Sequence, residues 1–327
     1  MIKFGRALMS VLALSAAVAA APNTATAQAD YPSKPVRVII PFAAGGGNDI
    51  FARIIGDKFA KLTGQQFIIE NKPGAGGRIA AEFVMGQPAD GYTVFVGASG
   101  VMSVAAAAYP KLSYHPTKTF IPLTMTASFP LILVSPIDNP AKTVKELVEW
   151  AKANPNKSNY GATSPAFIIA SELLKLKSGM PGQMIPYKSS NEMVLSVIQG
   201  QTLFVMSDGP PAVPQVKGGK VRALAVTGSE RIPELPDVPS MTEAGYPGVD
   251  THLWSGWFVA ANTPPAIAAK LESTLRAAIA DPEVNAKLKA LAVKPGGGSS
   301  ADFRKLIDAD IENYTAVIKA ANLKFEN

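Results

Sequence analysis

Two glycine-rich segments, each set between a short apolar run and a helical pattern, constrain the fold of this chain most strongly. The first, residues 41–49 (PFAAGGGND), lies between the apolar run Val36–Ile40 and the helical pattern Ile50–Leu62. The second, residues 71–77 (NKPGAGG), follows Phe67–Glu70 and also precedes a helical pattern. Glycine lets a backbone approach a ligand closely, and the helix that follows points free N–H groups toward it. Two such segments predict a small anion-binding site built mostly from main chain.

Strand and helix patterns alternate along the first part of the chain. Val36–Ile40, Phe67–Glu70 and Thr93–Gly97 are short runs rich in β-branched or aromatic residues and bounded by glycine and proline. In residues 50–62 the apolar side chains recur at spacings of three and four, which is typical of an amphipathic helix. The alternation predicts an α/β fold with a parallel sheet covered by helices. A ligand would then bind beyond the carboxyl ends of the strands.

A second α/β unit follows the first. Leu131–Val134 is expected to be a strand, and the helix Val144–Ala153 is expected to begin after Thr143, with Glu146 completing a capping box. Further helices are expected at 166–177, 191–199, 264–280 and 301–321, and further strands at 203–206, 221–226 and 254–259. The helices near the C-terminus therefore have no long strand partners of their own.

The length of the chain indicates two domains. Because the C-terminal helices lack long strand partners, we expect them to pack back on the first unit. This predicts a discontinuous lobe 1, residues 30–126 and 253–327, with an inserted lobe 2, residues 127–252. The chain would cross between the lobes near 126–130 and again near 251–254.

The N-terminus has the pattern of a secretory signal peptide. A basic start precedes the apolar residues 7–21, and A-T-A at 25–27 matches a small-residue cleavage site. The apolar run is shorter than the roughly 20 residues that a membrane span needs, which disfavours an uncleaved anchor. We expect residues 1–27 to be removed, with cleavage after Ala27 or Ala29, and the mature protein to reside in a bacterial periplasm.

Charge and cysteine content narrow the classes of partner. The chain has 31 Lys and Arg, 25 Asp and Glu, and 0 Cys. The predicted leader holds two basic residues and no acidic ones, so its removal lowers the net charge from +6 to +4. There is no long basic run interleaved with aromatic residues, which argues against nucleic acid as a partner. Without cysteine a Cys/His zinc site is excluded, and we expect a monomer with neither metal nor cofactor.

An enzymatic alternative has few residues to support it. Residues 97–101 (GASGV) are similar to a nucleophile elbow, but Val101 stands where that motif requires glycine. The best catalytic pairing would be Ser99 with His115 or His252, the two histidines of the chain. We therefore predict a binding protein in which the Ser99 hydroxyl faces the ligand. A secreted enzyme that acts on a carboxylate in the same cleft is the alternative.

Four further polar residues are candidates for the binding site. Asp49 can cap the helix that follows it, contact the ligand, or do both. Since its carboxylate would repel an anion, we expect Asp49 to organise loop N–H groups or ordered water. Thr163 and Ser164 precede a helix and offer either a second anion contact or an ordinary cap. Asp208 follows a strand and would accept a hydrogen bond from a ligand hydroxyl or amine, or brace the hinge.

Motifs in a fixed order along nearly the whole mature chain resemble those of one family. They are PFAAGG at 41–46 with Asp49, ENKPGAGG at 70–77, PADGYT at 88–93, IPYK at 185–188, VRALAV at 221–226 and PDVPS at 236–240. In these motifs the chain resembles the periplasmic solute-binding proteins of tripartite tricarboxylate transporters, often called Bug proteins. The resemblance implies a two-lobed, type II-like periplasmic-binding-protein fold, with two sheets flanked by helices and a ligand cleft between the lobes.

The same resemblance implies a function and a site. The function is capture of a small organic carboxylate, either a di- or tricarboxylate or an aromatic acid, for the membrane permease of a tripartite transporter. A ligand carrier for a signalling system is an alternative. The glycine-rich loops would hold a ligand carboxylate, partly through ordered water, and lobe 2 would set which molecule is accepted. The residues implied as ligand-binding are Phe42, Ala44, Gly45, Asp49, Ala75, Gly76, Ser99, Thr163, Ser164 and Asp208.

One segment departs from the pattern of the family. Relatives often carry a Gly/Ser/Thr-rich segment leading to His-Leu where this chain has residues 165–169 (PAFII), with Ile168 at the histidine position. Phe167 and Ile168 would make the pocket more apolar. This favours an aromatic or longer-chain acid as the ligand.

Overall fold

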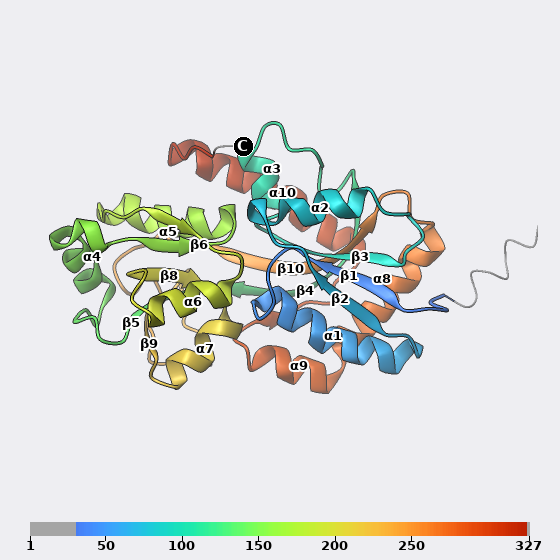
Figure 1. The fold of residues 1–327 in the computed structure, drawn as a ribbon, viewed down its shortest axis with the longest axis horizontal. Helices are drawn as coiled ribbons and strands as arrows, with labels where there is room; N and C mark the ends of the chain where they lie inside the picture. The colour runs from blue at the N-terminus through green and yellow to red at the C-terminus, as the bar shows by residue number, and fades with distance from the viewer. Residues whose placement is uncertain (1–30, 326–327) are drawn as a thin grey trace, which may run out of the picture.

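The computed structural model describes residues 31–325, which form two β-sheets side by side, each covered by helices (Figure 1). We use lobe 1 for the part built on the first sheet and lobe 2 for the part built on the second. The signal peptide predicted for residues 1–27 lies outside the described residues. Within residues 31–325, none of the helices has the length and apolar character needed to cross a membrane.

The sheet of lobe 1 has six strands in the order β11–β4–β10–β3–β1–β2. They are β1 (Val36–Ile40), β2 (Phe67–Asn71), β3 (Thr93–Ala98), β4 (Phe120–Pro130), β10 (His252–Ala260) and β11 (Lys294–Pro295). Strand β1 pairs in parallel with β2 and β3, whereas β10 runs antiparallel to both β3 and β4. The expectation of a parallel sheet is therefore confirmed for β1, β2 and β3, from which it was made, and is wrong for the sheet as a whole. Strand β10 returns from lobe 2 and enters the sheet in the opposite direction.

The sheet of lobe 2 has five strands in the order β7–β6–β8–β5–β9. They are β5 (Ile132–Pro136), β6 (Tyr160–Ala162), β7 (Met184–Pro186), β8 (Phe204–Ser207) and β9 (Val221–Val226). Strand β6 is parallel to β7 and β8, whereas β5 is antiparallel to β8 and β9. Both sheets are thus mixed. In each of them the strands that pair in parallel are connected through helices, as the geometry of crossover connections requires.

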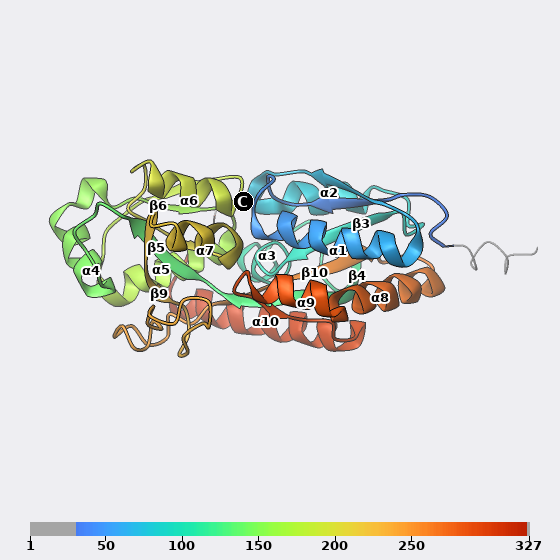
Figure 2. The ribbon, with the colours of Figure 1, turned by 90° about the horizontal axis from the view of Figure 1, so that it is seen from below.

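Helices cover both sheets. Around lobe 1 lie α1 (Gly47–Thr63), α2 (Arg78–Met85), α3 (Ser103–Ala108), α8 (Pro265–Ala280), α9 (Pro282–Lys289) and α10 (Ser300–Ala320) (Figure 1). Around lobe 2 lie α4 (Val144–Ala153), α5 (Pro165–Ser178), α6 (Ser190–Ile198) and α7 (Gly209–Lys217). The C-terminal helices pack against α1, α3 and β4 of lobe 1. Figure 2 shows α10 running along the lower side of the molecule, beneath β4 and β10.

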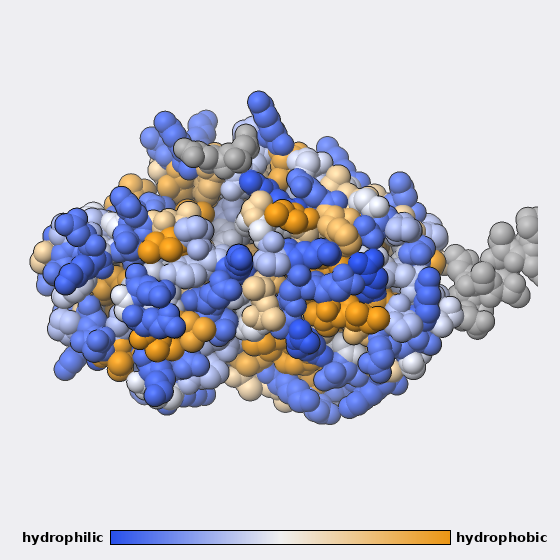
Figure 3. Space-filling model, viewed as in Figure 1, coloured by the Kyte–Doolittle hydropathy of each residue, from blue (hydrophilic) through white to orange (hydrophobic). Residues whose placement is uncertain are grey.

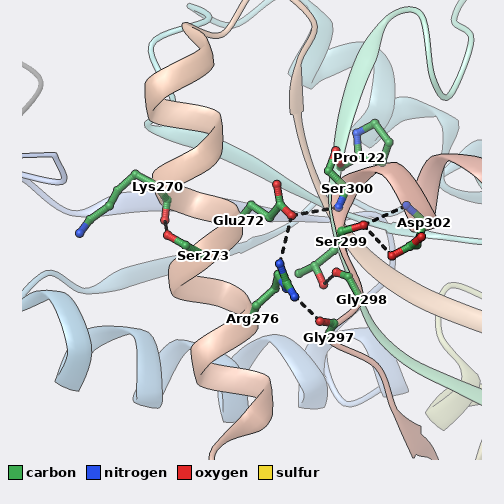
Figure 4. Close-up of polar contacts among 11 residues, drawn as sticks. Pro122, Lys270, Glu272, Ser273, Arg276, Gly297, Gly298, Ser299, Ser300 and Asp302 are labelled. Atoms are coloured by element: carbon green, nitrogen blue, oxygen red, sulfur yellow. Dashed lines mark hydrogen bonds and ion pairs between the residues drawn. The ribbon is translucent and has the colours of Figure 1, made fainter.

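The segment between β11 and α10 is fixed to lobe 1 by polar contacts (Figure 4). Ser300 donates a hydrogen bond from Oγ to the carbonyl of Pro122 on β4, 2.6 Å away. Thr124, two residues further along β4, donates from Oγ1 to the carbonyl of Gly298 at 2.8 Å. Glu272 on α8 accepts from the Ser300 N–H at 3.0 Å. These bonds hold the start of α10 between α8 and the edge of the sheet.

Two connections join the lobes, and the Thr227 side chain links them. The chain passes from β4 to β5 at Leu131 and returns through residues 227–251. Thr227 Oγ1 accepts from the Leu131 N–H at 2.8 Å and donates to the carbonyl of Thr251 at 2.7 Å. All three residues are buried. The two crossings therefore lie side by side and form a narrow, hydrogen-bonded joint.

Local signals in the sequence explain many of the boundaries. Thr143 Oγ1 accepts from the Glu146 N–H at 3.1 Å, as expected for an N-cap of α4. The Glu146 carboxylate accepts from the N–H of Lys142, one residue before the cap. The predicted capping box would instead use the N–H of Thr143 itself. Strand β4 and helices α3 and α9 were not anticipated from the sequence.

Candidate functional site

The two glycine-rich loops lie next to each other at the carboxyl ends of β1 and β2. Asn71, the last residue of β2, donates from Nδ2 to the carbonyl of Phe42 at 2.9 Å and to Asp49 Oδ1 at 3.1 Å. The N–H of Lys72 donates to the carbonyl of Ile40 at 2.8 Å. The spatial pairing of the loops that the sequence predicted is therefore present. Asn71 joins the strand before the second loop to both ends of the first.

Asp49 organises the first loop from inside. Its carboxylate is buried and accepts hydrogen bonds from the N–H of Gly45 at 3.1 Å, from Asn71, and from two nitrogens of Arg53 at 2.9 and 3.0 Å. Burial by itself raises the pKa of Asp49, but the bonds from Arg53, Gly45 and Asn71 together hold it below its usual value. Asp49 is thus ionised at neutral pH. The Arg53 contact was missed, although its spacing of four residues on α1 is the spacing of a helical ion pair.

Helix α1 begins inside the glycine-rich loop. It starts at Gly47, with Gly46 as its N-cap and no side chain capping it, rather than at Ile50 as the sequence predicted. Gly45 has a φ of +84°, in the left-handed region that glycine adopts without strain. Ala44 is exposed next to it. The first turn of the helix, where N–H groups have no partner within the helix, is therefore part of the loop.

The second loop has an unusual backbone. Gly74, Ala75, Gly76 and Gly77 all have positive φ, at 136°, 48°, 64° and 96°. Ala75 is exposed and is the one member of this run with a side chain at positive φ. Residues 75–77 form a 3₁₀ turn that leads directly into α2. The Gly77 N–H closes this turn by donating to the Gly74 carbonyl at 2.8 Å. Turns of this kind can present neighbouring N–H groups to an anion.

The start of α5 in lobe 2 faces the second loop. Thr163 and Ser164 are both buried and precede α5, whose first residue is Pro165. The Cβ position of Gly76 would lie 3.4 Å from Pro165 Cδ, and a Cβ on Gly100 would overlap Ser164 Oγ. The hydroxyl of Ser164 has no hydrogen-bond partner among the described residues and does not cap α5. A buried hydroxyl without a partner indicates a place where a ligand or water supplies the bond.

The start of α6 in lobe 2 faces the first loop. The N–H of Ala43 donates to the carbonyl of Lys188 at 2.9 Å, which is a backbone bond between the lobes. The Cβ positions of Gly45 and Gly46 would lie 3.5 Å from Asn191 Nδ2 and 3.2 Å from Ser190 Oγ. Residues 188–191 were not anticipated as part of the site. The Ser189 hydroxyl caps α6 by accepting from the Glu192 N–H at 3.2 Å, and this local pattern gives no indication that the helix meets lobe 1.

Asp208 lies at the same lobe boundary. It follows β8 at the N-cap position of α7 and is 2% exposed. The Ser207 hydroxyl donates to its Oδ1 at 3.5 Å, and polar groups of Ser190 and Gly47 beside the carboxylate act to lower its pKa. Burial nevertheless dominates and raises the pKa of Asp208 to about 6. A carboxylate from lobe 2 thus rests on the first residue of helix α1 in lobe 1.

Ser99 lies inside lobe 1. It is fully buried, its Oγ accepts from the N–H of Trp254 at 3.3 Å, and its N–H donates to the Trp254 carbonyl at 3.0 Å. These bonds anchor the end of β3 to β10. The two histidines are engaged elsewhere, since His115 Nδ1 contacts Thr117 and His252 Nδ1 contacts Asp250. The hydroxyl of Ser99 is therefore already engaged by a neighbouring strand.

The apolar residues of α5 occupy two environments. Phe167 is buried and belongs to the hydrophobic core of the molecule. Ile168 is half-buried and packs against the edge of that core. Both lie in the first turn of the helix that begins beside Ser164. Of these two side chains, that of Ile168 is the one that remains partly accessible, in the same first turn that follows Ser164.

The architecture is that of periplasmic binding proteins. The structure matches BugD, a periplasmic binding protein, with a TM-score of 0.86 at 29% identity over 90% of this chain and 100% of that chain. It matches R. palustris Rpa4515 with adipate at 0.85, with 31% identity over 89% and 98% of the two chains. It matches MatC from Rhodopseudomonas palustris with bound malate at 0.84, with 30% identity over 88% and 100%. The expected fold class is confirmed.

The family follows from the sequence match. A family model described as "Tripartite tricarboxylate transporter family receptor" matches residues 51–323, so the chain belongs to that family. It is a receptor of the periplasmic binding protein class and not an enzyme, as the sequence predicted. The pairing of Ser99 with a histidine, on which the enzymatic alternative rested, therefore has no role in the assignment.

Proposed function

We propose that this receptor captures a small organic carboxylate between its lobes and delivers it to the permease of a tripartite transporter. One observation carries the proposal. The two glycine-rich loops lie side by side, held by Asp49 and Asn71, at the place where Ala43 and Gly76 meet lobe 2. Main-chain amides at the starts of helices are a general means of binding carboxylates. The adipate and malate bound by related proteins fit this chemistry.

The proposed contacts in lobe 1 are mostly backbone groups. They come from Phe42, Ala44, Gly45, Ala75 and Gly76. Asp49 supports them without touching the anion directly, because its own negative charge would repel a carboxylate at close range. Ordered water bridging the loops to the ligand is compatible with this geometry, since water-mediated bonds are nearly as favourable as direct ones.

The proposed contacts in lobe 2 come from the start of α5. The unpartnered Oγ of Ser164 and the neighbouring Thr163 supply hydroxyls for the far end of the ligand. Ile168 supplies partly accessible apolar surface beside them. An apolar side chain at this position favours a ligand with a hydrocarbon segment over a compact polyacid. We therefore propose a longer-chain or aromatic acid as the preferred ligand.

The proposed lobes are residues 30–126 with 253–327 and residues 127–252, hinged at the joint around Thr227. A ligand that contacts both lobes binds only the closed form tightly, so it shifts the population toward closure. Closure in turn presents a loaded receptor to the permease. Export through a signal peptide at residues 1–27, and action as a monomer, complete the proposal.

Native mass spectrometry of the purified protein is the most direct test, because a closed receptor retains what it carried. Titration calorimetry would then compare adipate, benzoate, malate and citrate. We expect binding of at least one of these acids, with adipate or benzoate ahead of citrate. A receptor that carries a cation or a sugar and binds none of the four acids would refute the proposal. Capture of a purified permease by the loaded receptor, and not by the empty one, tests the partner.

A further inference from the structure

Resting on the two-lobed receptor proposed above, we infer that closure brings Asp208 of lobe 2 directly against Gly47 of lobe 1, and that this approach requires position 47 to have no side chain. Asp208 comes from the start of α7 in lobe 2, and Gly47 is the first residue of α1 in lobe 1. The Asp208 carboxylate lies directly against Gly47, so close that a Cβ on Gly47 would overlap Asp208 Oδ2. This assigns Asp208 a role in positioning the lobes, in place of contact with the ligand.

The surroundings of Asp208 support this role. The Ser207 hydroxyl donates to Asp208 Oδ1 at 3.5 Å, and a polar group of Ser190 acts on the carboxylate to lower its pKa. Both serines belong to lobe 2 and stay beside Asp208 when the lobes separate. Gly47 belongs to lobe 1, so its close contact with Asp208 forms only when the lobes close.

The space around Gly47 makes this position sensitive. A Cβ built on Gly47 would overlap Asp208 Oδ2 and lie 3.1 Å from Asp208 Cγ, whereas the nearest atom of another residue, a ring carbon of Phe51, would lie at an ordinary 3.5 Å. Gly47 lies in helix α1 and is not among the glycines with positive φ, so alanine fits its backbone conformation. Glycine at this position is therefore required by the approach of Asp208 and not by the turn. An alanine there would obstruct closure without straining lobe 1.

Other contacts along the boundary agree with a closed arrangement. The Ala43 N–H bonds to the carbonyl of Lys188, and Gly100 faces Ser164 so closely that a Cβ would overlap its hydroxyl. Asp208 differs from these contacts in being a buried charged group. Removing a carboxylate from water costs free energy that only its bonding partners offset. The Gly47 contact therefore makes closure sensitive to the fit at this position.

Distances between labels on the two lobes test the inference. Because the chain has 0 Cys, cysteines introduced at the exposed Asp57 on α1 and Lys145 on α4 are the only sites for spin labels. Pulsed electron spin resonance of the ligand-free protein then reports open and closed populations as long and short distances. We expect Gly47→Ala to reduce the short-distance fraction roughly tenfold. Adding Asp208→Ala to Gly47→Ala should restore that fraction, because a smaller side chain accommodates the new Cβ.

Two controls separate an effect on closure from an effect on folding. Gly86→Ala changes another lobe 1 glycine of negative φ, whose Cβ would meet its nearest neighbour at an ordinary 3.6 Å, and should leave the distances unchanged. The melting temperature of Gly47→Ala should not fall below that of the parent protein. The inference is overturned if Gly47→Ala keeps the parent distance distribution, or if Asp208→Ala fails to restore the short distance. No ligand is added, so these results stand whether or not the receptor binds a carboxylate.

Discussion

Asn71 donates one hydrogen bond to the Asp49 carboxylate, with Nδ2 and Oδ1 3.1 Å apart. A second bond from the same nitrogen reaches the carbonyl of Phe42. One side-chain amide therefore ties the strand before the second glycine-rich loop to both ends of the first. The two loops form one structural unit, and substitutions in it should affect ligand binding more than folding.

Asp49→Ala should weaken carboxylate binding at least about tenfold, which corresponds to about 1.4 kcal/mol. The substitution frees the Gly45 N–H, Arg53 and Asn71 from their common acceptor, so the first loop loses its fixed shape. Calorimetry with the best-binding acid measures the change. Arg53→Gln is the matched control, because it leaves Asp49 and both loop contacts in place and should retain most of the affinity. Unchanged affinity in Asp49→Ala would refute this role for the carboxylate.

Asp208→Asn should alter the pH dependence of stability. The folded protein raises the pKa of Asp208 from 3.8 to about 6, so folding favours its protonated form. Protonated Asp208 therefore makes its full contribution to the stability of the fold below about pH 4, and this contribution is lost as the pH rises through 6. The free energy of unfolding of Asp208→Asn relative to the parent should thus increase by up to about 3 kcal/mol between pH 4 and pH 7.

Denaturant unfolding of both proteins at several pH values measures this difference. The charged side chains on the elements packed around Asp208 include Asp49 and Arg53 on α1 and Glu192 on α6. They are the same in both proteins, so their titration cancels in the comparison. A difference that stays constant from pH 4 to pH 7 would contradict the assignment of a buried, titrating carboxylate to position 208.

Ser164→Ala should weaken ligand binding without lowering the stability of the empty receptor. Its hydroxyl is buried and has no partner in the described part of the chain, so its removal costs no protein hydrogen bond. If a ligand or bridging water supplies that bond, affinity falls by about 1 kcal/mol. Thermal unfolding with and without ligand distinguishes the two effects. A stability loss equal in both conditions would show that the hydroxyl serves the fold.

Ser99→Ala should lower the stability of the protein and leave its ligand affinity nearly unchanged, the opposite of what we expect for Ser164→Ala. The Ser99 hydroxyl accepts from the Trp254 N–H inside lobe 1, and its loss leaves a buried donor without a partner. We expect a stability loss of about 1–2 kcal/mol with affinity within about twofold of the parent. Chemical denaturation and calorimetry together measure both quantities. A large loss of affinity without a loss of stability would restore Ser99 to the ligand site.

Ile168→Ser should reduce the preference for longer acids. The side chain is half-buried at the start of α5 and adds apolar surface beside Ser164. Replacing it with serine removes roughly two to three carbons of apolar contact, worth about 1–2 kcal/mol where a hydrocarbon chain is buried against them. The affinity for adipate should fall relative to that for malate. An unchanged ratio of the two affinities would place the hydrocarbon segment of the ligand elsewhere.

Local features could be predicted from the sequence because their causes are local. The strand Val36–Ile40 and the helix Val144–Ala153 have the predicted bounds, since a β-branched run and a capping threonine define them without tertiary help. Strand β4 was missed because its eleven residues begin and end near prolines and mix polar with apolar side chains. Helix α3 consists largely of alanines and has no capping side chain to mark its start.

Features that depend on the packing of one lobe on the other could not be predicted. The direction of β10 follows from where the chain returns out of lobe 2, which no local pattern encodes. The same holds for the contacts of Lys188 with Ala43 and of Asp208 with Gly47. The position of the glycine-rich loops was predictable, because strand ends in one sheet share an edge.

The surface offers no single hydrophobic band for a partner on the face in view. Hydrophobic side chains appear there as separate patches over both lobes, between hydrophilic ones (Figure 3). Large side chains that are exposed include Ile68 and Ile79 in lobe 1 and Leu176 and Leu195 in lobe 2. A permease that recognises the closed receptor would meet both lobes at once, and its footprint would then change with their relative position.

The left-handed run from Gly74 to Gly77 has a consequence for how such receptors diversify. The anchoring groups that we propose are peptide N–H groups, and their placement depends on the glycines of this run, since a Cβ on Gly74 or Gly77 would overlap Ile79 or Val101. Cargo preference can then drift through a few positions near the start of α5 while the anchor for the acid group persists. A shared backbone anchor combined with a variable region in the opposite lobe would let duplicated receptors acquire new nutrients while they keep the same way of binding the acid group.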